Sequence, residues 1–187
     1  QVIVVPIAAH KPGVTEKARE LMERLKKAGL RVKIDESDNS PGWKFAQYEM
    51  KGVPLRLEVG PKDIENSQCV MVRRDNGEKT FVSFDALEES AEKLLQAVHD
   101  GMYAKALKNL EENTRIAHSL EEAKAIQQEK GGFVKTMWCG SPECEQRMKD
   151  EAGMSSRCRP YRQERLDGHC AVCGGEAREM VIWGVAY

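Results

Sequence analysis

The segment from Ser40 to Asp63 constrains the fold more than any other part of the chain, because it predicts a helix, a stop and a strand in direct succession. Ser40 is a good N-cap and Pro41 suits the first helical position, so a short helix should begin here. Gly52 can adopt the left-handed conformation that ends such a helix. Leu55–Val59 alternates apolar with charged residues, which is typical of a strand with one buried face.

Charged side chains are expected to gather on one side of this segment. Strict alternation places Arg56 and Glu58 on the strand face opposite the core, and Lys44, Glu49 and Lys51 can reach the same side from the helix. One interpretation is an ordinary solvated surface with ion pairs. Another is a site for guanine, whose N7 and O6 accept hydrogen bonds from Lys or Arg and whose N1–H and N2–H2 donate to Glu or Asp.

Strands and helices alternate around this segment. Val2–Ile7 and Leu30–Ile34 read as strands, and apolar residues at helical spacing predict a helix between them. Asn76-Gly77 predicts a hairpin turn joining the strands Cys69–Arg73 and Lys79–Ser83. These elements predict an α/β fold, with a mixed β-sheet flanked by helices.

A helical stretch follows the hairpin. Its apolar stripe starts at Leu87 and predicts a helix that runs to about His118, roughly 50 Å at about 1.5 Å per residue. A second helix should cover about Leu120 to Glu129. We therefore expect an α/β domain over residues 1–100, a helical linker over 101–130 and a small α+β domain over 131–187.

Four cysteines form two short-spaced pairs, Cys139 with Cys144 and Cys170 with Cys173, and two glycines follow the second pair. Short spacing lets backbone amides turn toward one tetrahedral ion, and four thiolates select zinc by softness and geometry. Four protein thiolates leave no open position for a catalytic water, so the metal would be structural. The surrounding tail has little apolar core in the sequence, so we expect it to need the metal to fold.

Other uses of these cysteines stay open. A disulfide framework would suit an exported protein, although nothing in the sequence indicates export. A redox Cys-x-x-Cys pair would sit at a helix N-terminus, whereas Cys170–Cys173 is expected between turns and a final strand. An iron–sulfur cluster is compatible with the ligands alone. His169 and Cys158 are spare candidate ligands.

Length and charge bound the function. The 187 residues suffice for one large or two small domains, and no apolar run approaches membrane-spanning length. Residues 85–129 carry ten acidic and five basic side chains, or −5, so the net charge of −1 leaves +4 on the remainder. RNA binding would therefore rest on placed contacts and not on bulk charge. We also expect no signal peptide and, because Gln1 leads directly into a buried strand, a segment of a longer protein.

Two parts of the sequence resemble one known family. The run Pro-Gly-Trp-Lys-Phe-x-x-x-Glu-x-Lys-Gly-Val-Pro-Leu-Arg-x-Glu-Val-Gly-Pro-Lys-Asp is similar to the signature of the anticodon-binding domain of prolyl-tRNA synthetases. The tail resembles the zinc-binding domain of the archaeal and eukaryotic-like type, and Tyr187 ends the chain as in that family. The preceding Gly184-Val185-Ala186 departs from the Gly-Arg-Ser common there. The matching ligand positions are Cys139, Cys144, Cys170 and Cys173.

The resemblance implies the C-terminal part of a class II enzyme. That enzyme joins proline to tRNA(Pro) in the cytoplasm, uses ATP and magnesium, and is a homodimer built mainly on its catalytic domain. Neither the ATP-binding motifs of that class nor a Walker loop occurs in this sequence, so we expect this chain to bind RNA and zinc without catalysis. The Tyr187 carboxylate would reach toward the catalytic domain of the same protein.

The resemblance also assigns the charged segment to the anticodon. Proline anticodons share two guanines, and single-stranded loops can splay their bases onto a protein surface. We expect Arg56 and Lys51 to meet guanine acceptors or phosphates, and Glu49 and Glu58 to meet N1–H and N2–H2, which requires an open groove beside Arg56 and Glu58. The remaining candidates are Phe45, for stacking or for the core, and then Lys44, Lys62 and Asp63.

Two alternatives to proline anticodon recognition remain. The chain could be a zinc-stabilised protein-interaction module without RNA specificity. It could also carry the related anticodon domain of a threonine, histidine or glycine enzyme, but the four-cysteine tail disfavours this alternative. A free-standing hydrolase or oxidoreductase is disfavoured, because no nucleophile–base pair and no cofactor loop can be named.

Overall fold

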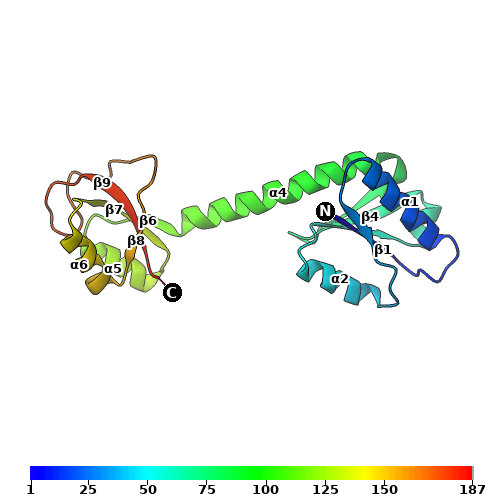
Figure 1. Cartoon of the computed structure of the whole chain (residues 1–187), viewed down its shortest axis with the longest axis horizontal. Coiled ribbons are helices and arrows are strands. Elements are labelled where there is room, and N and C mark those ends of the chain that lie inside the picture. The colour runs from blue at the N-terminus through cyan, green and yellow to red at the C-terminus, as the bar shows by residue number, and fades with distance from the viewer. Residues whose placement is uncertain (187) are drawn as a thin grey trace. The chain divides into compact units, whose positions relative to one another are not determined.

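The structure is a computed structural model that describes residues 1–186, so the expectation for the Tyr187 carboxylate lies outside the described residues. The chain divides into two units, Gln1–Ala104 and Lys105–Tyr187, and the division falls within helix α4 (Leu87–Glu112). Each unit has its own sheet and its own helices (Figure 1). Among residues 1–186, none of the helices has the length and apolarity that crossing a bilayer would need.

The first unit is built on a five-stranded mixed sheet in the order β2-β1-β3-β4-β5. β1 lies parallel to β2 and to β3, whereas β3, β4 and β5 are antiparallel neighbours. The predicted mixed α/β fold is therefore confirmed. The elements are β1 (Val2–Pro6), α1 (Val14–Lys27), β2 (Val32–Ile34), α2 (Pro41–Met50), β3 (Leu55–Val59), α3 (Pro61–Glu65), β4 (Gln68–Arg73), β5 (Lys79–Ser83), a 3-10 turn (Phe84–Ala86) and α4.

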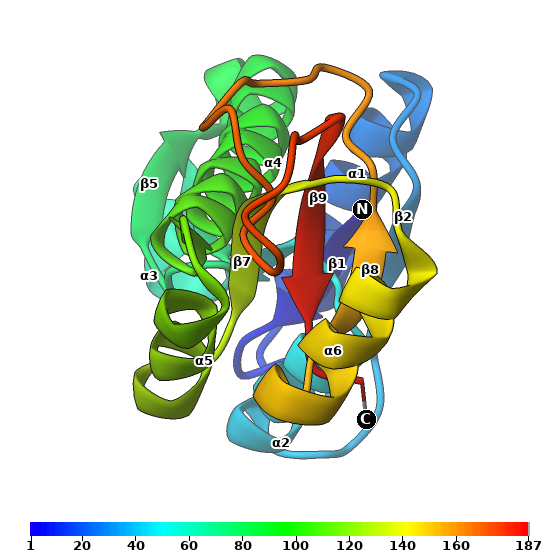
Figure 2. The ribbon, with the colours of Figure 1, turned by 90° about the vertical axis from the view of Figure 1, so that its left-hand side faces the viewer.

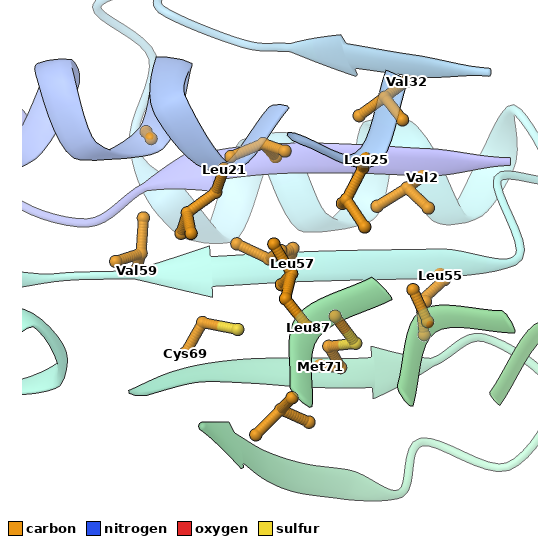
Figure 3. Packing of buried hydrophobic residues seen from close by; sticks show 14 residues of the cluster. Val2, Leu21, Leu25, Val32, Leu55, Leu57, Val59, Cys69, Met71 and Leu87 are labelled. Carbon is orange, nitrogen blue, oxygen red and sulfur yellow. The ribbon is translucent and has the colours of Figure 1, made fainter. Parts of the chain in front are cut away.

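The two faces of this sheet differ in what covers them. Side chains such as Leu57 of β3 and Met71 of β4 pack against Leu21 and Leu25 of α1 and against Leu87 of α4, which closes a hydrophobic core (Figure 3). Helix α2 lies on the opposite side of the sheet from α1 (Figure 1). The face of β3 that carries its charged residues is therefore the face toward α2.

Local signals built α2 as predicted. The Ser40 hydroxyl accepts a hydrogen bond from the backbone N–H of Trp43 at 3.4 Å, and Pro41 occupies the first turn. Gly52 has a φ of 76°, the left-handed conformation expected after the helix. The hairpin between β4 and β5 likewise forms, with Gly77 at a φ of 74°.

The second unit holds a four-stranded sheet in the order β6-β7-β9-β8, in which only the β6–β7 pair is parallel. Helices α5 and α6 pack against each other and against one face of this sheet (Figure 2). The elements are β6 (Thr114–Ile116), α5 (Leu120–Glu129), β7 (Phe133–Trp138), α6 (Pro142–Ala152), β8 (Ser155–Cys158) and β9 (Glu179–Gly184).

The helix predicted to reach about His118 ends earlier, at Glu112, so that prediction was wrong over its last turn and a half. Thr114–Ile116 instead forms a strand beside β7, and the N–H of Phe133 donates to the carbonyl oxygen of Asn113 at 2.8 Å. Strand pairing satisfies the same backbone groups that a longer helix would have used. The glycine before β7, Gly132, allows this close approach, since its φ is 86° and an added Cβ would lie 2.4 Å from the Asn113 oxygen.

The apolar core of the second unit is larger than the sequence suggested. Trp183 of β9 is fully buried, and its ring N–H donates to the Thr136 hydroxyl at 2.9 Å. Met148 of α6 and Leu120 and Ala123 of α5 pack around it. The sequence analysis considered only residues 131–187, and α5 precedes them, so it left out the apolar side chains that α5 adds to this core.

Candidate nucleic-acid interface and metal centre

Four of the predicted RNA-contacting residues meet in one group, which we call the Arg56 cluster: Phe45 and Glu49 of α2, and Arg56 and Glu58 of β3. The Arg56 Nε donates to Glu58 Oε1 at 2.8 Å, and its Nη1 donates to Glu49 Oε1 at 2.8 Å. The guanidinium carbon lies 3.8 Å from the centre of the Phe45 ring, a cation–π contact. This geometry confirms the predicted grouping for Arg56, Glu58 and Glu49, but not for Lys44 and Lys51, which make other contacts.

The cluster is less open than the sequence analysis required. Arg56 is only 9% exposed and the Glu58 side chain only 12%. Alternation correctly placed both residues opposite the core, but α2 covers that face. Glu49 is the open end of the cluster, because its side chain is 55% exposed. Arg56 has five N–H donors, and the hydrogen bonds of the described residues engage only its Nε and Nη1.

A small hollow beside the cluster, with a volume of about 10 Å³, brings in a residue that the sequence analysis missed. It is lined by Tyr48, Glu49 and Arg56 and, from the end of β4, by Arg73 and Arg74. Arg73 is held by Asp75 at 2.7 Å, whereas Arg74 is exposed and no carboxylate in the described residues pairs with it. The antiparallel register of β3 and β4 causes this proximity, and the predicted hairpin was the only sequence signal that pointed to it.

Lys44 does not reach the cluster. It is 3% exposed, and its Nζ donates to the backbone oxygen of Asp35 at 3.0 Å and lies 3.7 Å from Asp35 Oδ1. Burial disfavours ionised Asp35, but hydrogen bonds from Ser37 and Tyr48 and the nearby Lys44 charge together hold the pKa of the Asp35 carboxyl below its ordinary value. Lys44 and Asp35 thus form a buried ion pair that ties α2 to the end of β2.

Three further predicted RNA contacts, Asp63, Lys62 and Lys51, make contacts other than those of the Arg56 cluster. Asp63 accepts a hydrogen bond from the Gly60 N–H at 2.8 Å and so caps α3. Lys62 is exposed on the same helix. Lys51 is exposed after α2, with its Nζ 5.1 Å from the centre of the Tyr48 ring. Exposed lysines of this kind can meet phosphates without reading sequence.

The four predicted metal ligands come together in the second unit. Cys139 directly follows β7, Cys144 lies in the first turn of α6, and Cys170 and Cys173 lie in the turn before β9. All four sulfur atoms lie within 4.8 Å of one another, with Sγ–Sγ distances of 3.7 Å for Cys139–Cys144 and 3.9 Å for Cys139–Cys173. A tetrahedron with metal–sulfur bonds of about 2.3 Å has sulfurs about 3.8 Å apart. The group therefore has the size of a four-thiolate metal site.

Caps and a tight turn place these thiols. The Ser141 hydroxyl caps α6 by accepting from the Cys144 N–H at 3.4 Å. The Cys170 N–H donates to the Gly175 oxygen at 2.7 Å, and the Gly174 N–H donates to the Cys170 oxygen at 2.9 Å, with Gly174 at a φ of 72°. The glycines after the second pair thus form the tight turn that carries Cys170 and Cys173.

The thiols differ in acidity. Burial, followed by the neighbouring thiols, raises the pKa of Cys144 to about 12. Burial also disfavours the Cys170 thiolate, but backbone N–H donors outweigh it and lower the pKa of that thiol to about 7. Cys139 and Cys173 complete the group, and all four are free thiols, which disfavours the disulfide alternative. Within residues 1–186, neither His169 nor Cys158 belongs to the cluster.

Comparison with known proteins gives matches in both units. Residues 1–94 match the family described as "Anticodon binding domain", and residues 120–187 match the family described as "Prolyl-tRNA synthetase, C-terminal". Over all 187 residues the chain is 54% identical to the "Proline--tRNA ligase" of Clostridium novyi (strain NT) and 54% identical to the "Proline--tRNA ligase 2" of Bacillus thuringiensis (strain Al Hakam). It is 49% identical to the "Proline--tRNA ligase" of Clostridium botulinum (strain 657 / Type Ba4). The whole chain aligns each time but covers only 39% of the relative.

Proposed function

Because the chain belongs to the prolyl-tRNA synthetase family, with an anticodon-binding domain and the family's C-terminal domain, we propose that its first unit reads the two guanines of proline anticodons. The complete protein would join proline to tRNA(Pro) in the cytoplasm, with ATP and Mg²⁺ bound by a catalytic domain that this chain does not include. We propose a homodimer for that protein, with the catalytic domain as a further partner of this chain. The chain alone would bind RNA without catalysing the ligation.

The Arg56 cluster carries this proposal. The half-exposed Glu49 carboxylate suits guanine N1–H and N2–H2, which it would accept as a pair. Arg56 holds Glu49 in place through Nη1 and keeps Nη2 for guanine O6 or N7. Glu58 anchors the other end of the guanidinium, and Phe45 supports its plane. A mutually paired cluster is preorganised, so little side-chain entropy is lost when the base arrives.

The remaining candidates divide by exposure. Lys51, Lys62 and Arg74 are exposed, and we assign them to phosphates or to the outer edges of the anticodon bases. Lys44 and Asp63 are engaged within the protein, so we assign them to holding α2 and α3 in place. Lys44 and Asp63 would affect RNA binding only by keeping the first unit folded.

The second unit would hold zinc on Cys139, Cys144, Cys170 and Cys173. The sulfur spacing fits a tetrahedral ion, and thiolates with no oxygen ligand favour zinc or an iron–sulfur cluster. Bound zinc would cross-link β7, α6 and the turn before β9. Elemental analysis of the purified protein separates the two metals, since one zinc per chain without visible absorption supports the zinc assignment. Stoichiometric iron with labile sulfide would contradict it.

A stem-loop titration tests the anticodon assignment. The protein is titrated with a stem-loop that bears a G-G anticodon and with one in which both guanines are replaced. We expect tighter binding of the G-G loop, and we expect Glu49→Gln to weaken that binding by about 1–3 kcal/mol while barely changing binding of the replaced loop. Glu23→Gln is the matched control, because Glu23 is 54% exposed and lies on α1.

Arg56 is tested with lysine and not with alanine. Alanine would leave the buried Glu58 unpaired and would destabilise the fold, whereas lysine keeps the charge but loses the planar fork of donors. Arg56→Lys should therefore lose discrimination between the two loops while the protein stays folded. Equal binding of both loops by the unmodified protein would contradict the proposal and would favour the zinc-stabilised protein-interaction module.

A further inference from the structure

The end of β8 and the loop that follows it carry a concentration of arginine that the proposed function leaves unused. Four arginines fall within residues 157–165, where Glu164 is the only acidic residue, so this segment carries +3 in a chain with a net charge of −1. All four are exposed, as is Tyr161 between them. We call residues 157–165 the arginine loop. Its arginines are Arg157, Arg159, Arg162 and Arg165.

Few contacts within the protein use these charges. Arg157 donates from Nε and Nη2 to the Gly184 oxygen at 3.3 and 3.0 Å, and Arg159 meets Glu179 at 3.3 Å in an exposed pair that contributes little. No acceptor in the described part of the chain pairs with Arg162 or Arg165. Glu164 cannot neutralise them fully, because it already pairs with Lys135 at 3.3 Å.

The loop is nevertheless pinned to the sheet. The Met180 N–H donates to Gln163 Oε1 at 2.7 Å, and Gln163 Nε2 donates to the Pro160 oxygen at 2.9 Å and to the Met180 oxygen at 3.3 Å. Gln163 thereby holds the arginine loop against the start of β9. The segment between β8 and β9 arches beyond the sheet (Figure 2). Tyr161 stays fully exposed, so its ring contributes nothing to the core.

A hollow lies at the base of the loop. It has a volume of about 370 Å³ and is lined by Trp138, Ser156, Arg157 and Arg159, among others, with Glu145 as an acidic member. Arg157 and Arg159 are the basic residues of its lining. A sugar-phosphate unit would fit such a hollow, because guanidinium groups donate in pairs to phosphate oxygens.

From these observations we propose that the arginine loop binds the sugar-phosphate backbone of RNA, with Arg162 and Arg165 on phosphates and Tyr161 stacked on a base or ribose. The inference rests on the proposed function, since the RNA would be the tRNA whose anticodon the first unit reads. The combination of free arginines with an exposed aromatic ring favours nucleic acid over an acidic peptide, because a peptide carboxylate needs no stacking surface. The contact would be independent of base sequence.

Filter binding with full-length transcripts tests the inference. One transcript is a proline tRNA, and in the other both anticodon guanines are replaced. At about 0.15 M salt, a phosphate contact on a nucleic acid contributes about fourfold to fivefold in affinity, so Arg162→Ala/Arg165→Ala should weaken binding of both transcripts about 15-fold to 25-fold. The slope of log affinity against log salt should become shallower by about 1.4–1.8. Tyr161→Ala should weaken both by about fivefold or more.

Lys124→Ala/Lys149→Ala is the matched control. It removes two positive charges from exposed positions on α5 and α6 of the same unit and should leave affinity and salt slope nearly unchanged. Unchanged hydrogen exchange in β8 and β9 shows that the loop variants stay folded. Discrimination of the guanines should survive in every loop variant, because the arginine loop does not read them.

The two proposals can fail separately. If the unmodified protein discriminates the transcripts but Arg162→Ala/Arg165→Ala keeps its full affinity and salt slope, the arginine loop inference is overturned and anticodon reading stands. If the loop variant weakens binding while the unmodified protein does not discriminate, anticodon reading fails and backbone binding by the loop is supported. Polyglutamate serves as a probe for acidic peptides. If Arg162→Ala/Arg165→Ala weakens binding of polyglutamate but not of RNA, the loop is a protein-binding site and the inference is overturned.

Discussion

Replacing Lys44 with methionine gives a direct test of how the first unit is held together. The Lys44 ammonium is buried against Asp35, with its Nζ 3.7 Å from Asp35 Oδ1 and 3.0 Å from the Asp35 backbone oxygen. Methionine retains most of the apolar stem and removes the charge. The sequence analysis treated Lys44 as an RNA contact, whereas the structure gives it a role in stability.

The expected loss follows from the geometry. A charge pair at 3.7 Å is worth about 4.5 kcal/mol at an effective dielectric constant of about 20. Removing one partner of a buried pair typically costs about 3–5 kcal/mol. In Lys44→Met, Asp35 keeps hydrogen bonds from the Ser37 N–H at 2.9 Å and from the Ser37 hydroxyl at 2.6 Å. The cost of Lys44→Met should therefore lie at the lower end of this range of about 3–5 kcal/mol. We expect a loss of about 3 kcal/mol in the free energy of unfolding of the first unit, or about 15 °C in its Tm.

Hydrogen exchange during a guanidinium titration measures this loss for each unit separately. Peptides from β1 and β3 report the first unit, and peptides from β7 and β9 report the second and act as the internal control. The midpoint should fall for the first set and stay constant for the second. Below its Tm, Lys44→Met should still discriminate between the G-G and the replaced stem-loop.

A double-mutant cycle with Asp35→Asn decides whether the ion pair is responsible. Because the two residues form one pair, the double variant should lose at least about 1 kcal/mol less than the sum of the single losses. Losses that add within about 0.5 kcal/mol would refute the ion-pair argument. A folded Lys44→Met protein that no longer discriminates the stem-loops would place Lys44 in contact with RNA and would contradict its assignment here.

Three further predictions concern the metal, a backbone contact and acid stability. Cys144→Ser should weaken metal binding by more than about a hundredfold and remove exchange protection from β7 and β9, whereas Cys158→Ser, outside the cluster, should bind metal normally. Gly132→Ala should destabilise the second unit by about 2–4 kcal/mol in chemical denaturation, and a loss near that of Gly131→Ala would contradict the clash with the Asn113 oxygen. Hydrogen bonding to Arg24 holds the pKa of the Glu88 carboxyl below 4.5, so the pair stabilises the first unit above that pH and the contribution disappears as pH falls through the lowered value. Glu88→Gln should therefore unfold with a flatter pH dependence in this acid range, and an unchanged dependence would exclude the pair as its source.

Much of the local structure could be predicted from the sequence, because a few neighbouring residues encode it. The Ser40 cap, the left-handed Gly52 and the alternation along Leu55–Val59 all depend on backbone geometry within one or two turns. Each cysteine pair could be recognised for the same reason, since its spacing is short, but the folding of β7, α6 and the turn before β9 brings the two pairs together. The family resemblance extended that information along the chain.

Contacts between segments distant in the sequence determined the features that the sequence did not predict. Alternation shows that Arg56 and Glu58 lie opposite the core, but only the docking of α2 on that face buries them and pairs Arg56 with Glu49. Likewise Arg74 comes near the cluster only through the register of two antiparallel strands. The helix after Leu87 stops at Glu112 because the next residues pair with β7, about 20 positions further along the chain. Dihedral preferences and periodicity are carried by adjacent residues, whereas burial and charge pairing depend on segments that meet only after the chain has folded.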